Sequence, residues 1–297
     1  MAISFKDKVV IVTGAGAGLG RSHALEFARR GAKVVVNDLG GKVDGSGGGS
    51  EAALKVVEEI KALGGEAIAN GASVADRAGA ESIVNDAVAK WGRIDVVVNN
   101  AGILRDKSFA KGELDDFELV LKVHLLGSVY VTKAAWPHFL NQKYGRVVLT
   151  TSSSGLYGNF GQSNYGAAKL GLVGLQNTLK LEGAKNNIHI NTIAPVAATR
   201  MTENLGIPDD LLKQLKPELI SSAVVFLASD DAPTGAIIEA GAGYFAKVQI
   251  VEGKGVKLGV DATADDFAAN WEKIADVSEA KPFNSGSDVI VKIFSPG

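Results

Sequence analysis

Short apolar runs rich in valine and isoleucine alternate along this chain with longer segments rich in alanine, leucine, glutamate and lysine. The runs lie at 8–13, 32–37, 66–70, 94–99, 145–151 and 188–194. Helix-compatible segments lie at 20–30, 50–63, 78–91, 115–140 and 165–182. Near-continuous apolar runs are typical of parallel strands covered on both faces, and strand alternating with helix indicates βαβ units. The sequence therefore predicts an α/β fold with one doubly wound parallel sheet and helices on both of its faces.

The regular alternation weakens after about residue 243. We expect residues 1–245 to form one domain and residues 246–297 to form a C-terminal extension or linker, because so short a piece with few large apolar side chains is marginal alone. A glycine-rich stretch, 40–50, follows the second strand, and its composition favours a flexible surface connection.

Composition excludes several classes of function. The net charge is −2, so nothing indicates binding to nucleic acid or to an anionic membrane. There are no cysteines, the four histidines show no metal-ligand spacing, and we expect no metal site. No apolar run reaches the roughly 18 residues of a membrane span.

A glycine-rich turn joins the first strand to the first helix, in the sequence Thr13–Gly20. Two glycine patterns overlap here, Gly14-x-Gly16 and Gly14-x-x-x-Gly18-x-Gly20, and either would let backbone approach a pyrophosphate at a helix N-terminus, giving the predicted fold a Rossmann-type cofactor site. Asp38 ends the second strand, where a carboxylate accepts hydrogen bonds from ribose hydroxyls and repels a 2′-phosphate. This favours NAD over NADP, although each feature also fits an ordinary turn.

Two further strand ends are candidates for contact with the same cofactor. Asn99–Gly102 follows the fourth strand with small residues, so Asn100, Ala101 and Gly102 could lie close to a dinucleotide. Ser73 and Val74 follow the third strand and are weaker candidates for an adenine site.

Ser152, Tyr165 and Lys169 are the candidate catalytic residues. Tyr165 and Lys169 lie four apart in a helix-compatible segment, which places them on one face. An ammonium near a phenol favours the phenolate, so we expect the pKa of Tyr165 to fall from about 10, which suits proton exchange with an alcohol or carbonyl. Ser152 closes an apolar strand and could bind the same substrate oxygen. Taken alone, a Tyr-x-x-x-Lys pair is more often a surface contact.

Together these motifs resemble the short-chain dehydrogenase/reductase family over roughly residues 5–245. The matching features are Gly14-x-x-x-Gly18-x-Gly20, Asn99-Asn100-Ala101-Gly102, Ser152 and Tyr165-x-x-x-Lys169. Longer stretches such as VVVNDLGG, NNAGILRD and GNFGQSNYGAAKLGL resemble one branch, the dehydrogenase part of the type 2 peroxisomal multifunctional enzymes.

The resemblance implies roles for individual residues. Tyr165 would be the acid/base, Lys169 would lower its pKa and hold the nicotinamide ribose, and Ser152 would orient the substrate. The implied cofactor contacts are Gly14, Gly18, Leu19, Gly20, Asp38, Asn100, Ala101, Gly102, Tyr165 and Lys169, with Ala197, Ala198, Thr199 and Arg200 near the nicotinamide.

The branch implies NAD-dependent oxidation of (3R)-3-hydroxyacyl-CoA to 3-ketoacyl-CoA in peroxisomal fatty-acid β-oxidation. It also implies a homodimer that pairs through the helices at 115–140 and 165–182, a peroxisomal location, and hydratase or lipid-carrier domains further along a longer chain.

Two positions depart from the wider family. His124 stands where many members carry a relay asparagine, so the relay uses His124 or a backbone carbonyl, or His124 only packs. Val196 follows Pro195 where many members have glycine, so we expect a differently shaped loop. Substrate selection is expected in residues 201–218, with Arg105, Lys107 and Arg200 as candidates for binding CoA phosphates.

Other functions remain open at this point. The same chemistry could serve a steroid or another secondary alcohol. A catalytically silent nucleotide-binding scaffold would usually have lost one of the three candidate catalytic residues. A methyltransferase would leave the Tyr165–Lys169 pair unexplained.

Overall fold

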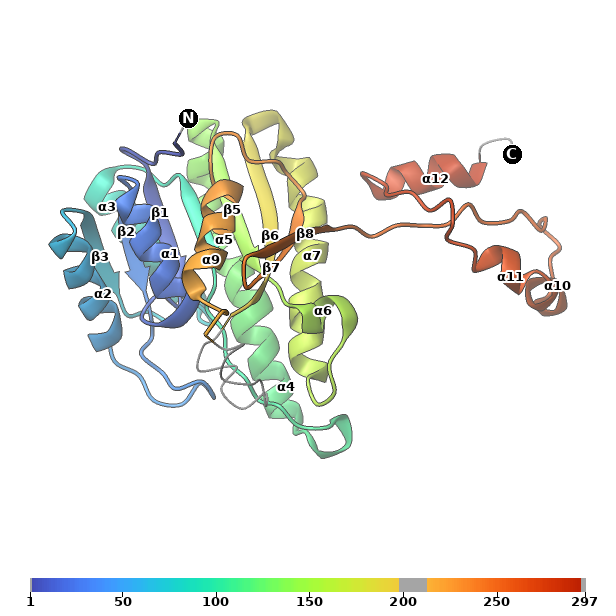
Figure 1. The fold of residues 1–297 in the computed structure, drawn as a ribbon, viewed down its shortest axis with the longest axis horizontal. Helices are drawn as coiled ribbons and strands as arrows, with labels where there is room; N and C mark the ends of the chain where they lie inside the picture. The colour runs from blue at the N-terminus through green and yellow to red at the C-terminus, as the bar shows by residue number, and fades with distance from the viewer. Residues whose placement is uncertain (1, 198–212, 295–297) are drawn as a thin grey trace. The chain divides into compact units, whose positions relative to one another are not determined.

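The computed structural model describes residues 2–197 and 213–294 of the chain. Eight strands form one sheet in the order β3-β2-β1-β4-β5-β6-β7-β8 (Figure 1). The strands are β1 Val9–Thr13, β2 Lys33–Asn37, β3 Glu66–Asn70, β4 Val96–Asn99, β5 Gly145–Thr150, β6 Ile188–Val196, β7 Ile237–Gly241 and β8 Tyr244–Val248. Every pair from β3 to β7 is parallel, and the order reverses between β1 and β4. The predicted doubly wound sheet is confirmed.

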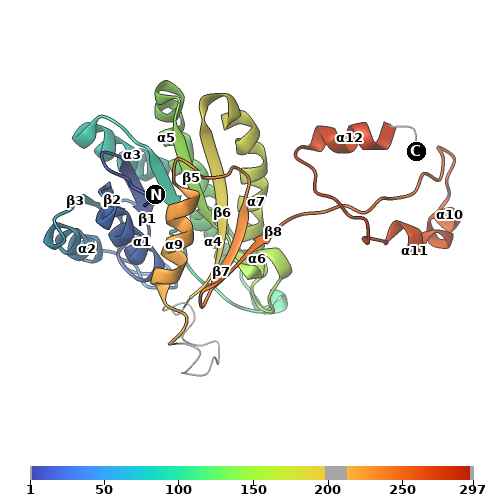
Figure 2. The same ribbon diagram turned by 45° about the horizontal axis from the view of Figure 1, so that its top comes forward.

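Helices cover both faces of this sheet (Figures 1 and 2). One face carries α1 Gly18–Arg29, α2 Glu51–Ala62 and α9 Pro217–Leu227, and the other carries α3 Arg77–Trp91, α5 Gly127–Gln142 and α7 Ser163–Gly183. Two shorter helices, α4 Leu114–Leu121 and α6 Ser153–Tyr157, pack on α7. Val10 and Val12 of β1 enter the core with α1, whereas Val9 and Ile11 enter the core with α3. Burial on both faces explains why the strands are near-continuous apolar runs.

The single helix expected at 115–140 is interrupted. A π-helical turn, Lys122–Leu126, separates α4 from α5 and carries His124. Such turns insert one residue into a helix and change which side chains face inward, which hydropathy alone does not reveal. The strand expected to end at residue 194 continues through Val196, because Pro195 pairs with Ala240 of β7.

The sheet ends in a hairpin and the chain then leaves it. Ala242 and Gly243 have left-handed backbone angles (φ 50° and 79°), as in a type I′ turn, so β8 runs antiparallel to β7. The chain divides into two compact units, Met1–Lys247 and Val248–Gly297. The sequence predicted this boundary two residues earlier, after residue 245. The second unit contains α10 Ala264–Ala269, α11 Trp271–Ile274 and α12 Gly286–Phe294, and none of its described residues is buried.

A buried polar cluster joins α1 to α9. His23 is fully buried, and its Nδ1 lies 2.8 Å from Ser221 Oγ, which also lies 2.8 Å from Ser22 Oγ. Its Nε2 has no hydrogen-bond partner among the described residues. Burial lowers the pKa of His23 to about 3, so the folded protein keeps this imidazole neutral.

Replacing His23 should flatten the dependence of stability on pH. An unfolded histidine titrates near 6.5, so the unfolded state binds the extra proton between pH 6.5 and 3, and stability falls as the pH falls through that range. From pH 6.5 to 5, His23 should account for a loss of about 1.5 kcal/mol. Urea unfolding of wild type and His23→Asn at both pH values measures the difference. Equal losses in the two proteins would contradict this assignment.

Candidate functional site

The glycine turn closes the carboxyl end of β1 tightly. Gly14 has φ +63°, and a Cβ there would lie 2.7 Å from Ala101 Cα. A Cβ on Gly20 would overlap the Gly14 carbonyl oxygen. Side chains at either position would push β1 away from the segment that follows β4, so glycine is required by close backbone contact.

Polar contacts tie the same two strand ends together. The Asn100 side chain donates to the carbonyl oxygens of Thr13 and Gly14 at 3.0 and 3.1 Å. Thr13 Oγ1 accepts from the backbone N–H groups of Asn100 and Ala101 at 3.0 and 3.1 Å. The ends of β1 and β4 are thus fixed where the strand order reverses, which is where open α/β sheets bind ligands.

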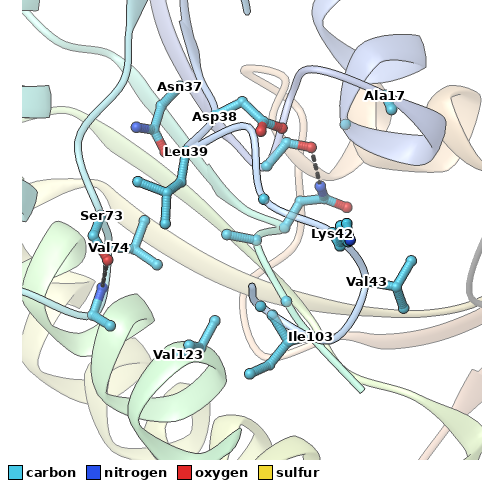
Figure 3. Close-up of a pocket in the computed structure, with 18 of the residues that line it drawn as sticks. Ala17, Asn37, Asp38, Leu39, Lys42, Val43, Ser73, Val74, Ile103 and Val123 are labelled. Atoms are coloured by element: carbon cyan, nitrogen blue, oxygen red, sulfur yellow. Dashed lines mark hydrogen bonds between the residues drawn. The ribbon is translucent and has the colours of Figure 1, made fainter. Parts of the chain in front are cut away.

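A cavity of about 370 Å³ lies at this point (Figure 3). Ten of the residues expected to contact a cofactor line it: Gly14, Gly18, Leu19, Gly20, Asp38, Ser73, Val74, Asn100, Ala101 and Gly102. The sequence did not single out the other lining residues, among them Asn37, Leu39, Lys42, Val43, Ile103, Leu119 and Val123. Ala197 is buried in the core instead of lining the cavity, while Ala198, Thr199, Arg200 and most of 201–218 lie outside the described residues.

Asp38 is held in place by backbone donors. Its Oδ2 accepts from the Gly16 N–H and its Oδ1 accepts from the Gly40 N–H, both at 2.7 Å. These bonds orient the carboxylate at the cavity wall, and each oxygen retains a further lone pair.

The glycine-rich stretch after β2 is more than a surface connection. No residue of 40–50 is buried, as expected of a surface connection, but Gly41, Lys42, Val43 and Gly45 also line the cavity, which the sequence did not predict. Glycine content indicates backbone freedom, but it does not say what the backbone packs against.

Ser152, Tyr165 and Lys169 come together at the carboxyl end of β5. Lys169 is buried, and its Nζ donates to the Thr150 carbonyl oxygen at 2.6 Å and lies 5.4 Å from the centre of the Tyr165 ring. Ser152 caps α6, where its Oγ accepts from the Ser154 N–H. Tyr165 and Lys169 lie one turn apart on α7, as the spacing in the sequence predicted, and Ser152 lies at the N-terminus of α6, which packs on α7.

Burial dominates the ionisation of this group. It raises the pKa of Tyr165 to about 12, although the hydrogen bond with Ser152 opposes the shift, and Asp106 adds to it. It lowers the pKa of Lys169 to about 7. The expected fall in the pKa of Tyr165 is therefore wrong for this structure, because desolvation of the phenolate outweighs a lysine whose own charge is destabilised by burial.

His124 connects this group to the cavity. Its ring meets the Tyr165 ring edge-on, with centres 5.1 Å apart at 89°, and its Nε2 lies 3.0 Å from the Ile103 nitrogen and 2.8 Å from the Ile103 oxygen. Among the described residues, its Nδ1 is buried without a partner. Burial and the neighbouring Lys169 hold the pKa of His124 well below its usual range, so the ring is neutral. Gly102 leaves room for it, since a Cβ there would overlap the ring.

Two of the three residues expected to bind CoA phosphates form ion pairs with Asp116. Arg105 NH1 donates to Asp116 Oδ1 at 2.7 Å, and Lys107 Nζ lies 3.8 Å from Asp116 Oδ2. Within 2–197 and 213–294, no cluster of three or more acidic or histidine side chains could hold a metal, and no helix is both long and apolar enough to cross a bilayer.

Comparison with known sequences gives consistent matches. The family described as short chain dehydrogenase matches residues 8–209. Peroxisomal multifunctional enzyme A of Dictyostelium discoideum is 49% identical over 99% of this chain, which covers 66% of that protein. Peroxisomal multifunctional enzyme type 2 of Mus musculus is 52% identical over 94% of this chain, which covers 38% of that protein. A short-chain type dehydrogenase/reductase of Mycobacterium tuberculosis is 51% identical and is covered over 96% of its length.

Solved structures agree with these matches. Full-length peroxisomal multifunctional enzyme type 2 from Drosophila melanogaster superposes with a TM-score of 0.83 and 40% identity, over 98% of this chain and 49% of that one. A 7α-hydroxysteroid dehydrogenase complexed with NADH and 7-oxo glycochenodeoxycholic acid superposes with a TM-score of 0.73 and 28% identity, over 81% and 95%.

The contact between Gly102 and His124 predicts energetic coupling. Gly102→Ala should destabilise the protein by about 1–3 kcal/mol through overpacking. In Gly102→Ala/His124→Ala the new methyl enters the space left by the ring, so the double variant should be more stable than the summed single effects by at least about 1 kcal/mol. Urea unfolding measures all four proteins. Gly112→Ala is the control, because the nearest atom to its Cβ is 3.6 Å away, and it should add independently to His124→Ala.

Proposed function

Because this chain belongs to the short-chain dehydrogenase family, we propose that it oxidises (3R)-3-hydroxyacyl-CoA to 3-ketoacyl-CoA with NAD. The observation that carries this proposal is the arrangement of Ser152, Tyr165 and Lys169 at the end of β5. His124 packs between this group and the cavity at the glycine turn. Oxidation of an alcohol by NAD needs a proton acceptor beside the nicotinamide, and Tyr165 would supply it.

The cavity suits a nicotinamide dinucleotide. Gly18, the first residue of α1, is exposed and lines the cavity, and the helix N-terminus there attracts phosphate. Asp38, held by Gly16 and Gly40, would accept hydrogen bonds from the adenosine ribose and repel a 2′-phosphate, which favours NAD. Ser73 and Val74 would flank the adenine. When bound, the oxidised nicotinamide would supply the hydride acceptor.

Proton transfer would fall to Tyr165. Its phenolate would take the hydroxyl proton while Ser152 holds the substrate oxygen, and Lys169 would stabilise the phenolate and bind the nicotinamide ribose. Because burial raises the pKa of Tyr165 and lowers that of Lys169, the base form of the tyrosine is scarce near neutral pH. Oxidation should therefore speed up as the pH rises.

His124 would support Tyr165 as a neutral ring. Its edge-on contact fixes the phenol from one side, and a hydrogen bond between its Nε2 and the Ile103 backbone fixes the ring itself. We assign it this positioning part in place of the asparagine found in many family members.

The substrate class rests on the relatives. Three of those described above are named multifunctional enzymes of the peroxisome, and this chain spans only part of their length. We infer by this likeness a peroxisomal location, partner domains such as a hydratase or lipid carrier in a longer chain, and a homodimer. Exposed Leu170 and Leu181 on α7 and Leu126 before α5 fit a helix-mediated dimer.

A steroid or other secondary alcohol is the second candidate substrate. It is favoured by the likeness to a hydroxysteroid dehydrogenase, which superposes at lower identity and whose structure is described as a complex with NADH and 7-oxo glycochenodeoxycholic acid.

NADH formation with (3R)- and (3S)-3-hydroxyacyl-CoA at alkaline pH tests the proposal. The (3R) substrate should be turned over, and Tyr165→Phe should lower kcat/KM by about 10³-fold, because a general base is lost. Tyr244→Phe, an exposed tyrosine on β8, serves as the matched control and should retain full activity.

Two other results would contradict the proposal. No turnover of either acyl-CoA, with turnover of a 3-hydroxysteroid, would replace the substrate assignment with the second candidate. Full activity of Tyr165→Phe would contradict the assigned base.

A further inference from the structure

A glycine-rich strap, defined as Leu39–Gly47, follows β2 and has its own internal structure. The Gly49 N–H donates to the Leu39 carbonyl oxygen at 2.7 Å and draws the two ends together. The Lys42 N–H donates to the Ser46 carbonyl oxygen at 2.8 Å and closes the tip. Glycines stand at 40, 41, 45 and 47, and at 48 and 49 just beyond it. Such a loop can keep its tip shape while its ends rotate.

The tip of the strap is docked on the segment between β4 and α4. Val43 accepts a hydrogen bond from the Leu104 N–H at 2.9 Å, and the Asp44 carbonyl oxygen accepts from Arg105 Nε at 2.6 Å. Arg105 is itself fixed by its bond to Asp116 on α4. Two hydrogen bonds therefore latch the tip to the opposite side of the cavity.

The base of the strap is joined to the glycine turn. Asp38 receives N–H groups from Gly40 of the strap and from Gly16 of the turn. Asn100 links that turn to the end of β4 through its bond to Gly14. Together with the latch, these bonds form a continuous ring of contacts around the cavity.

Gly45 allows the strap to close. It has φ +85°, and a Cβ there would lie 3.2 Å from Ile103 Cγ2, a residue of the cavity wall. A larger side chain would be strained in this conformation and would press the tip away from Ile103.

Lys42 gives the strap its chemistry. Among the described residues that line the cavity, Lys42 is the one cation and Asp38 the one anion. Figure 3 shows Lys42 beside Val43 of the strap, among the residues that line the cavity. A dinucleotide brings a diphosphate with two negative charges, and a lysine ammonium binds phosphate as a point charge.

We propose that the strap is a clasp for the dinucleotide: its latch opens to admit the ligand, and on closure Lys42 binds the diphosphate. This proposal rests on the proposed function, since it requires a dinucleotide in the cavity. The diphosphate would then be bound by the strap as well as by the glycine turn.

Binding of ADP-ribose and adenosine, measured by calorimetry at low salt, separates phosphate contact from nucleoside contact. Lys42→Ala should weaken ADP-ribose binding by about tenfold, the loss expected for one charged hydrogen bond, and should leave adenosine binding unchanged. Lys42→Arg should keep most of the affinity. Lys90→Ala, an exposed lysine near the end of α3, is the matched control and should change neither.

The strap itself is tested by the release of NADH. Gly45→Val leaves Lys42 in place but holds the tip off Ile103, so NADH should dissociate several-fold faster in stopped-flow chase experiments.

Other outcomes overturn the proposal. Equal ADP-ribose affinity in Lys42→Ala and wild type would remove the lysine from the site. Equal weakening of adenosine and ADP-ribose would place it on the nucleoside, and a loss seen only with NADPH would place it on a 2′-phosphate. If wild type binds neither ADP-ribose nor NADH, the proposed function itself is wrong.

Discussion

The candidate site depends on the hydrogen bonds from the Asn100 side chain to the carbonyl oxygens of Thr13 and Gly14. They join the ends of β1 and β4, the two neighbouring strands between which the sheet order reverses. Helices leave those two strands toward opposite faces, so the strand ends border an opening that side chains do not fill. Gly14 and Gly20 let the backbones meet there without closing it. The cavity is therefore a consequence of topology, and its lining is a consequence of sequence.

A line of buried contacts runs from that cavity to the candidate catalytic group. Gly102 leaves room for His124, His124 packs on Tyr165, and Lys169 lies under the phenol with its Nζ on the Thr150 carbonyl. Burial disfavours both the phenolate and the ammonium, so the tyrosine is protonated near neutral pH, and a positive charge placed beside it would favour its ionisation. This is the physical reason to expect proton transfer to be coupled to the charge of a nicotinamide.

Much of this architecture could be predicted from the sequence, because valine runs buried on both faces and glycine turns carry local signals. β3 was predicted to the residue, and the ten expected residues that line the cavity lie at strand ends or in the glycine turn and the first turn of α1. The π-helical turn at His124 and the docking of the strap on Arg105 depend on contacts between distant segments, which no local pattern encodes. The pKa of Tyr165 was misjudged because proximity to Lys169 is visible in the sequence, whereas the burial that outweighs it is not.

The fate of the hydrogen at C3 of the substrate tests the central claim most directly. With (3R)-3-hydroxyacyl-CoA carrying deuterium at C3, mass spectrometry of the reduced cofactor should find the deuterium in NADH, and Tyr165→Phe should form almost none of this product. NADH that lacks the label would mean that the hydride comes from another carbon, and the assignment of substrate and site chemistry would then be wrong.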